Sequence, residues 1–363
     1  MTTKNIFRPL ILITLFVVPL LMLTGVFYIW WNQAAPEKTC TNCHEINHAF
    51  NSWSESAHRE IACKECHGTA LSNGIHSLKE KSRMVFSHLK YDMHSDDIRL
   101  SEAQILETMD RCKNCHQSEY AKWQSGGHSV HYAAIFLNEN QNSKEQLSYD
   151  CLRCHGMFYE KTIADLVGPI STEGPWKLKE PGKAHQPTIP CMACHNIHSP
   201  GIPLPQPDYS EPKNIFYGRN ISNKSLGFYS RHEKIHFSPT SLPEPVIMVF
   251  GDTVRVPSDP VYRLCVQCHA PSVWHEAGTA DDRTPVGVHE GISCRACHEP
   301  HSNNQRNSCY KCHPGISNCN LDVKTMNTSY LSPSSPNNIH FMSCKSCHDD
   351  KPARKKIRAI SVQ

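Results

Sequence analysis

The pentapeptide Cys-x-x-Cys-His occurs nine times in this chain of 363 residues, and it constrains the fold more than any other feature. The nine copies use all but one of the 19 cysteines and leave only Cys319 outside the pattern. Zinc sites use paired cysteines without a histidine beside every second one. A disulfide framework gives no reason for a histidine there. The repeated pentapeptide is typical of covalent haem c attachment.

Each residue of the pentapeptide has a chemical role in such attachment. Two thiols one short turn apart form thioethers to the two vinyl groups of one porphyrin, and the adjoining imidazole reaches the iron as its proximal ligand. We therefore predict nine covalently attached haem c groups. The attachment residues are Cys40, Cys43, Cys63, Cys66, Cys112, Cys115, Cys151, Cys154, Cys191, Cys194, Cys265, Cys268, Cys294, Cys297, Cys309, Cys312, Cys344 and Cys347. The proximal ligands are His44, His67, His116, His155, His195, His269, His298, His313 and His348.

Nine haem sites leave little polypeptide for each site. Without the first 35 or so residues, the chain has roughly 36 residues per haem, too few for nine protein-only cores. The tetrapyrroles must supply much of the buried apolar surface, so we expect folding to depend on haem insertion. The predicted fold class is mainly α with extensive loops, organised by haem packing, with one N-terminal transmembrane helix and a small β-hairpin.

The N-terminus reads as a membrane anchor. Residues 6–31 are almost wholly apolar, are long enough to cross a bilayer and end in aromatic residues. Lys4 and Arg8 predict a cytoplasmic N-terminus, which places the haem part on the periplasmic or outer side of the inner membrane. The alternative is a signal peptide cleaved near residues 32–35, but the apolar run is longer than a normal signal core.

Beyond the anchor at 1–35, the chain divides by composition. We predict helices over 77–91 and from Ser101, where Gln104 completes a capping box; the same device recurs at Ser143 and Gln146. The Pro-rich segment 181–260 reads as loop. Within it, residues 246–256 read as a hairpin around Gly251 and Asp252. The predicted parts are a haem cluster with motifs 1–5 at 36–200, a connector at 201–260, a cluster with motifs 6–9 at 261–350 and a basic tail at 351–363.

The second axial ligands are expected among the histidines outside the motifs. The chain has 24 histidines, so fifteen remain after the nine proximal ones. Some of them precede an attachment motif by a few residues, follow one at a fixed offset, or share the context Trp-x-x-x-x-His. These seven predicted ligands are His58, His128, His185, His198, His289, His301 and His340, and the next candidates are His131, His275, His94 and His76. Sequence leaves the pairing of ligand with haem open.

The charge balance excludes an argument for nucleic-acid binding. The formal side-chain charge is +3. Two ionised propionates on each of nine haems add up to about −18, so the assembled protein is expected to be acidic.

The motifs also resemble known families. An anchor followed at once by Cys40-x-x-Cys43-His-Glu, and then by Trp53-x-x-x-x-His58, resembles the start of the NapC/NirT/NrfH family of membrane-anchored quinol dehydrogenases. Ile46 stands where members of that family commonly have Met. Trp-x-x-x-x-His and Cys-x-x-Cys-His-x-x-His units, the latter at 191–198 and 294–301, make the rest of the exported part similar to the superfamily of pentahaem nitrite reductase, hydroxylamine oxidoreductase and octahaem tetrathionate reductase. The Cys-x-x-Cys-Lys motif of many nitrite reductases is absent.

These observations predict a membrane-anchored electron-transfer protein of anaerobic respiration. Its expected partners are the quinol pool or a quinol-oxidising membrane protein on one side, and a periplasmic or outer-surface redox protein or terminal reductase on the other. The alternative is an enzyme that reduces or oxidises a small nitrogen or sulfur compound at one open-coordinate haem. Cys319 keeps that alternative open because a lone thiol near the eighth motif can bind iron or a sulfur substrate, although a small buried residue is the commoner role.

The haem stoichiometry follows directly from the motif count. Pyridine haemochrome quantitation against protein mass should give nine haems per chain, because each pentapeptide forms its own pair of thioether bonds. A value near five would contradict the prediction.

Overall fold

The computed structural model describes residues 7–33, 41, 44–68, 86, 100–139, 147–170, 175–199, 225–249, 251–270, 284–302, 309–313 and 338–342. The chain divides into two compact units. Unit 1 comprises Met1–Leu100 and His198–Pro200, and unit 2 comprises Ser101–Ile197 and Gly201–Gln363. Unit 2 takes in residues from both sides of the predicted connector at 201–260, and the division into two haem clusters stays a prediction.

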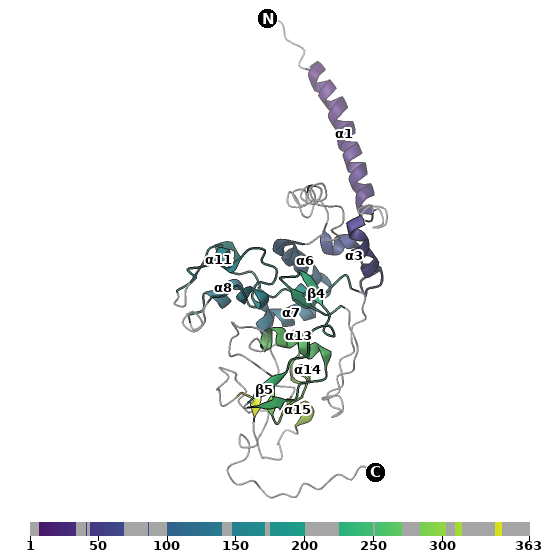
Figure 1. The fold of residues 1–363 in the computed structure, drawn as a ribbon. Coiled ribbons are helices and arrows are strands. Elements are labelled where there is room, and N and C mark those ends of the chain that lie inside the picture. The colour runs from purple at the N-terminus through teal and green to yellow at the C-terminus, as the bar shows by residue number, and fades with distance from the viewer. Residues whose placement is uncertain are drawn as a thin grey trace, which may run out of the picture. The chain divides into compact units, whose positions relative to one another are not determined.

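Unit 1 begins with a long apolar helix. The helices here are α1 (Phe7–Gln33), α3 (His44–Ser54) and α4 (Cys63–His67). Figure 1 shows α1 as one continuous helix; its segment Ile13–Trp30 has a mean hydropathy of 2.2 and no buried residue. At about 1.5 Å per residue, α1 is about 40 Å long, more than the ~30 Å hydrocarbon core of a bilayer. The expected helix is present and fits a membrane span, while its orientation and its retention stay predictions.

Unit 2 opens with helices that lead into the third motif. The elements are α6 (Glu102–Cys115), α7 (Gln117–Ser125), η1 (Gly127–Ser129) and α8 (Tyr132–Phe136). The predicted capping box is confirmed, because the Ser101 backbone N–H donates to Gln104 Oε1 over 2.7 Å. Ile105 and Met109 are buried, as the apolar spacing of this helix requires. The helix therefore carries Cys112 and Cys115 on its last turn.

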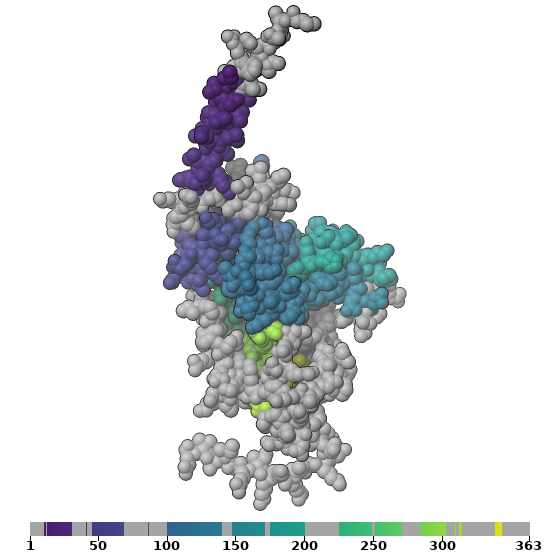
Figure 2. Space-filling view, turned by 180° about the vertical axis from the view of Figure 1, so that it is seen from behind, coloured from purple at the N-terminus to yellow at the C-terminus, as the bar shows by residue number. Residues whose placement is uncertain are grey.

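The main core of unit 2 packs around α8. It includes α10 (Cys151–Cys154), α11 (Ile163–Leu166) and the antiparallel strands β1 (Val167–Gly168) and β2 (Lys177–Leu178). Its fully buried side chains include Tyr132, Phe136, Leu152 and Leu166. Seen from behind in Figure 2, the atoms of this part of the chain, drawn in blue to teal, form one continuous body. The core thus lies directly beside the fourth motif, which α10 carries.

A buried ion pair fastens this core to α6. Glu102 is 6% exposed; it accepts a hydrogen bond from Tyr132 Oη over 2.5 Å and pairs with Lys183, at the end of η2 (Pro181–Lys183). Both partners leave the carboxylate well satisfied, which a buried charge requires.

Short strand pairs complete unit 2. They are β3 (Phe228–Ser230) with β4 (Ile235–Phe237), β5 (Ile247–Val249) with β6 (Asp252–Val254), and the parallel pair β7 (Val286–Gly287) with β8 (Phe341–Met342). The predicted hairpin is confirmed as β5–β6, with Gly251 at φ 93° in the turn. The reading of 181–260 as loop is wrong for 228–237, where β3 and β4 form a second hairpin. That hairpin lacks a Gly turn signal, and Lys234 takes the positive φ of 58° instead.

Motif-bearing elements of unit 2 are short. They are α10, η3 (Cys191–Ala193), α13 (Pro260–His269), α14 (Cys294–Cys297) and α15 (Cys309–Cys312), together with the end of α6. Several expectations lie outside the described residues: nearly all of the helix over 77–91, the capping box at Ser143 and Gln146, most of the Pro-rich stretch 200–212, and the basic tail 351–363.

The core assignment predicts the effect of one truncation. Phe136→Ala should lower the free energy of unfolding by about 3–5 kcal/mol, because it empties space beside the Tyr132 ring in a core that cannot fully collapse. The neighbouring Leu137→Ala, at a side chain with 36% exposure, should cost less than about 1 kcal/mol. Denaturant titrations of the two haem-loaded variants, followed by far-ultraviolet circular dichroism, measure both values. Equal losses would contradict the assignment.

Candidate haem-attachment sites

Seven of the nine pentapeptides lie among the described residues, and each occupies a short helical turn. Residues three apart on a helix share one face, so the two thiols of each motif point to the same side. In five motifs the backbone N–H of the histidine donates to the carbonyl of the first cysteine over 2.7 to 3.0 Å; these histidines are His116, His155, His195, His298 and His313. This repeated bond fixes where each imidazole leaves the helix.

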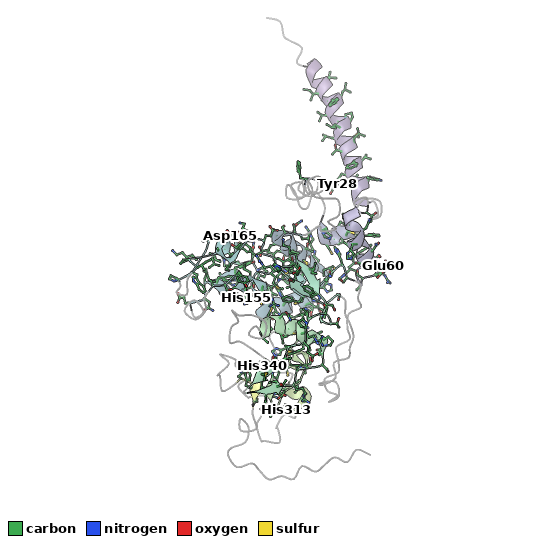
Figure 3. All side chains as sticks on the ribbon, in the orientation of Figure 1. Tyr28, Glu60, His155, Asp165, His313 and His340 are labelled. Atoms are coloured by element: carbon green, nitrogen blue, oxygen red, sulfur yellow. The ribbon has the colours of Figure 1, made fainter. Side chains whose placement is uncertain are left out.

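Five motif histidines face a histidine from outside the motifs. The pairs, with the distances between ring centroids, are His67 with His198 (5.8 Å), His269 with His128 (6.0 Å), His195 with His301 (5.8 Å), His313 with His289 (6.2 Å) and His298 with His340 (5.9 Å). The first pair lies in unit 1 and the other four in unit 2. Figure 3 labels His313 and His340 in the part of unit 2 that holds α15 and β8.

This spacing fits two axial ligands of one iron. A metal–imidazole bond is about 2 Å long and a ring nitrogen lies about 1 Å from its centroid, so two imidazoles on opposite sides of a metal ion have centroids about 6 Å apart. The five observed distances fall at that value. The donor set also fits, since an imidazole pair beside two thiols is what a bis-histidine haem c requires.

Hydrogen bonds at Nδ1 orient three of the non-motif rings. The Nδ1 atoms lie 3.0 Å from the Pro300 carbonyl for His128, 3.3 Å from the Ile339 carbonyl for His289, and 3.1 Å from Asn338 Oδ1 for His340. Because each partner oxygen only accepts, Nδ1 carries the proton and Nε2 keeps its lone pair for a metal. Such outer partners are the usual way proteins fix the orientation of a ligating histidine.

The parallel strands β7 and β8 bring two of these histidines together. Val286 pairs with Phe341, and Gly287 with Met342. His289 follows β7 and His340 precedes β8, so the strand pair sets both rings beside the last helices. Neither strand exceeds two residues, and sequence reasoning did not find them.

Burial keeps several of these imidazoles neutral. It lowers the pKa of His198 to about 4, with nearby His67 and His48 contributing further. Burial also lowers the pKa of His289 and of His301. The neutral form is the one that binds a metal, so these rings are available as ligands at neutral pH.

A sixth ring pair differs from the other five. His131 and His185 lie 5.7 Å apart, and neither belongs to a motif. His131 Nδ1 accepts the Ala134 backbone N–H over 3.1 Å and so caps α8, which leaves the proton on Nε2. The structure therefore places the predicted ligand His185 against a helix cap, and its role as an iron ligand stays a prediction.

His155 differs from the five paired motif histidines. Its Nδ1 is buried without a hydrogen-bond partner, and none of the described histidines faces its ring. Burial lowers its pKa to about 4. Figure 3 labels His155 in the part of unit 2 near α8 and α7.

The remaining expected residues fall into two groups. In the first, His116 is the C-cap residue of α6, and its axial partner stays a prediction. His58 lies in the turn before α4, where its backbone N–H donates to Ser56 Oγ over 3.1 Å, and its ligand role stays a prediction. The other group lies outside the described residues: Cys40, Cys43, the side chain of His44, Cys319, Cys344, Cys347, His348, His76, His94 and His275.

Polar residues inside and beside the motifs join one motif to another, which sequence reasoning missed. Asp259, 2% exposed, accepts Nε and Nη2 of Arg295 at 2.8 and 3.0 Å. Arg153 Nη2 donates to Gln267 Oε1 over 2.5 Å. Arg153, Gln267 and Arg295 each occupy one of the two variable positions between the cysteines of a motif. That position is the only feature of the sequence that points to these contacts.

Comparison with known protein families gives two matches. Residues 2–163 match the NapC/NirT cytochrome c family, N-terminal region, and residues 254–299 match cytochrome c554 and c-prime. Both matches are to c-type cytochromes. The first region contains α1 and motifs 1–4, and the second contains motifs 6 and 7. The resemblance inferred from the motifs is confirmed, and covalently bound haem c is the cofactor that both families imply.

A comparison with curated proteins points the same way. The cytochrome c-type protein NrfH of Wolinella succinogenes is 25% identical over 118 residues, which cover 31% of this chain and 64% of that relative. The chain thus spans less than two thirds of the length of the curated relative it matches. No solved structure matches the chain.

Proposed function

We propose that the chain is a membrane-anchored nonahaem cytochrome c of anaerobic respiration. It transfers electrons between the quinol pool, or a membrane quinol oxidase, and a periplasmic or outer-surface redox partner. The observation that carries this proposal is the set of five imidazole pairs at the spacing of bis-histidine ligation. The match of residues 2–163 to the NapC/NirT family supports the quinol side.

Different residues hold different parts of each cofactor. In each motif two thiols anchor the porphyrin edge and the adjoining imidazole supplies the proximal ligand. His198, His301, His128, His340 and His289 supply the distal ligands for motifs 2, 5, 6, 7 and 8, in that order. When bound, each haem iron exchanges one electron between its ferric and ferrous states. Six-coordinate irons offer no position for a substrate, which suits electron transfer rather than catalysis.

The distal assignment predicts the spectrum of one variant. His340→Ala should convert the haem of motif 7 from low-spin to high-spin, because Asn338 and Phe341 offer no replacement ligand, and added imidazole should restore the low-spin state. Electron paramagnetic resonance of the oxidised protein measures the change, about one haem in nine. His232→Ala is the matched control, since that side chain is 95% exposed and lies 3.9 Å from Glu233, its neighbour in the chain. An unchanged His340→Ala spectrum would remove this ligand from the assignment.

The quinol side needs a test of its own. α1 holds the haem-bearing chain at a membrane, where a lipid-soluble quinol is the nearest electron donor. Purified full-length protein in liposomes should therefore be reduced by menaquinol analogues, alone or with a quinol-oxidising membrane partner, as followed by haem absorbance. If neither preparation is reduced, the quinol-side assignment is wrong, and the haem assignment is unaffected.

One observation favours the second candidate function, an enzyme acting on a small nitrogen or sulfur compound. Among the described residues no imidazole faces His155, and its buried Nδ1 has no hydrogen-bond partner, so its haem is one to examine for an open distal position. A high-spin signal in the unmodified protein that shifts on adding nitrite, hydroxylamine or tetrathionate would favour catalysis. Nine low-spin haems that ignore all three compounds favour electron transfer.

A further inference from the structure

The sixth motif, Cys265–His269 at the end of α13, meets the fourth motif through two contacts. Cys154 Sγ lies 3.9 Å from the Gln267 carbonyl. Arg153 closes the contact with its 2.5 Å hydrogen bond to Gln267 Oε1. Each contact joins a residue of the fourth pentapeptide to a residue of the sixth, so the two attachment sites are held edge to edge.

The same motif meets the seventh motif. Cys294 packs against the buried cluster of Tyr262, Val266 and Ala270, which lie in α13 or directly after it. Asp259 caps α13 by accepting the Val261 N–H over 3.0 Å and also accepts Ser293 Oγ over 2.7 Å. Its bidentate pair with Arg295 completes the set, so every oxygen of this buried carboxylate is engaged. One side chain thus fixes the start of α13 and the start of α14 together.

The fifth motif approaches the sixth as well. Cys194 and Cys268 pack against the same buried apolar cluster around Phe228. On the distal side, the His128 ring that faces His269 is bonded to the Pro300 carbonyl, one residue before His301. His301 faces the fifth motif's His195. The two proposed ligand pairs are therefore neighbours on both sides.

From these contacts we infer that the sixth motif is a branch point, where the electron path divides among the fourth, fifth and seventh motifs, and that Asp259 and Gln267 are positioning residues for it. This inference rests on the proposed function. A thioether places the porphyrin edge one carbon–sulfur bond from each Sγ, so motifs in direct contact bring the edges of their haems close together. A linear path would give the sixth motif two neighbours, whereas these contacts give it three.

A ligand substitution can mark this haem. His128→Met should replace the distal imidazole of the sixth motif with a thioether, and His/Met ligation raises the reduction potential of that haem above its bis-histidine neighbours. Dithionite added at about one electron per protein then reduces the marked haem first and leaves it diamagnetic. The other ferric haems keep their spins, so any haem coupled to the marked one changes its paramagnetic resonance signal.

The branch predicts how many signals change. Reduction of the marked sixth haem should alter the signals of three other haems, while His289→Met, which marks the eighth motif, should alter fewer. If a His/Met haem forms in His128→Met but two or fewer other haems respond, the branch is overturned and the proposed function stands. If no His/Met haem forms, His128 is not the ligand, and the pairing under the proposed function fails together with the branch.

A second pair of variants tests Asp259 as a positioning residue. In the His128→Met background, Asp259→Asn keeps an acceptor for the helix cap but leaves Arg295 without its counter-charge. We expect loss of the seventh haem's response and a shift of the marked haem to higher potential, because the uncompensated cation favours the reduced state. Glu244→Gln is the control. The exposed Glu244 carboxylate pairs with Arg263, which belongs to α13, the helix that Asp259 caps. Equal behaviour of the two variants would overturn the positioning role.

Discussion

Two imidazole rings held with their centroids about 6 Å apart are the arrangement on which the rest of this structure depends. Five such pairs recur with different partners and different ring angles, from 16° between His298 and His340 to 82° between His289 and His313. The distance is kept while the angle varies, as expected if an iron atom between the rings is the common requirement. The polypeptide then serves to carry imidazoles to these positions.

This requirement explains why the secondary structure is so brief. A helix of four residues such as α10 or α14 is too short to be stable alone, yet it is long enough to place two thiols on one face. The strand pair β7–β8 has two residues on each side, but it sets His289 and His340 beside their motif partners. Within the part of the chain that the structure describes, the apolar cluster around Tyr132 and Phe136 contacts the fourth motif and no other. Bound tetrapyrroles are expected to supply the remaining buried surface.

Local sequence therefore predicts the attachment turns, and it does not predict how they assemble. The pentapeptides, the apolar run of α1, the capping box at Ser101 and the hairpin around Gly251 are all signalled within a few residues. The partner of His269 is His128, far away in the chain, and no local pattern encodes such a pairing. The offsets of His289 and His340 before a motif marked them as ligands, but each faces a motif other than the one it precedes. His185 shared that offset and meets a helix cap instead.

Residues at the variable positions of the pentapeptide link one motif to the next, so the motifs are not independent of one another. Removing two charges from water costs several kcal/mol, so the buried pair of Asp259 and Arg295 needs the further bonds from Ser293 and Val261 to be tolerated. Well-packed apolar residues would stabilise the fold at least as well. A directional contact does what apolar packing cannot, because it fixes the rotation of one motif against the next. The orientation of the sixth motif against the seventh is thus fixed in part by Arg295, a residue between the cysteines that the attachment chemistry itself leaves free.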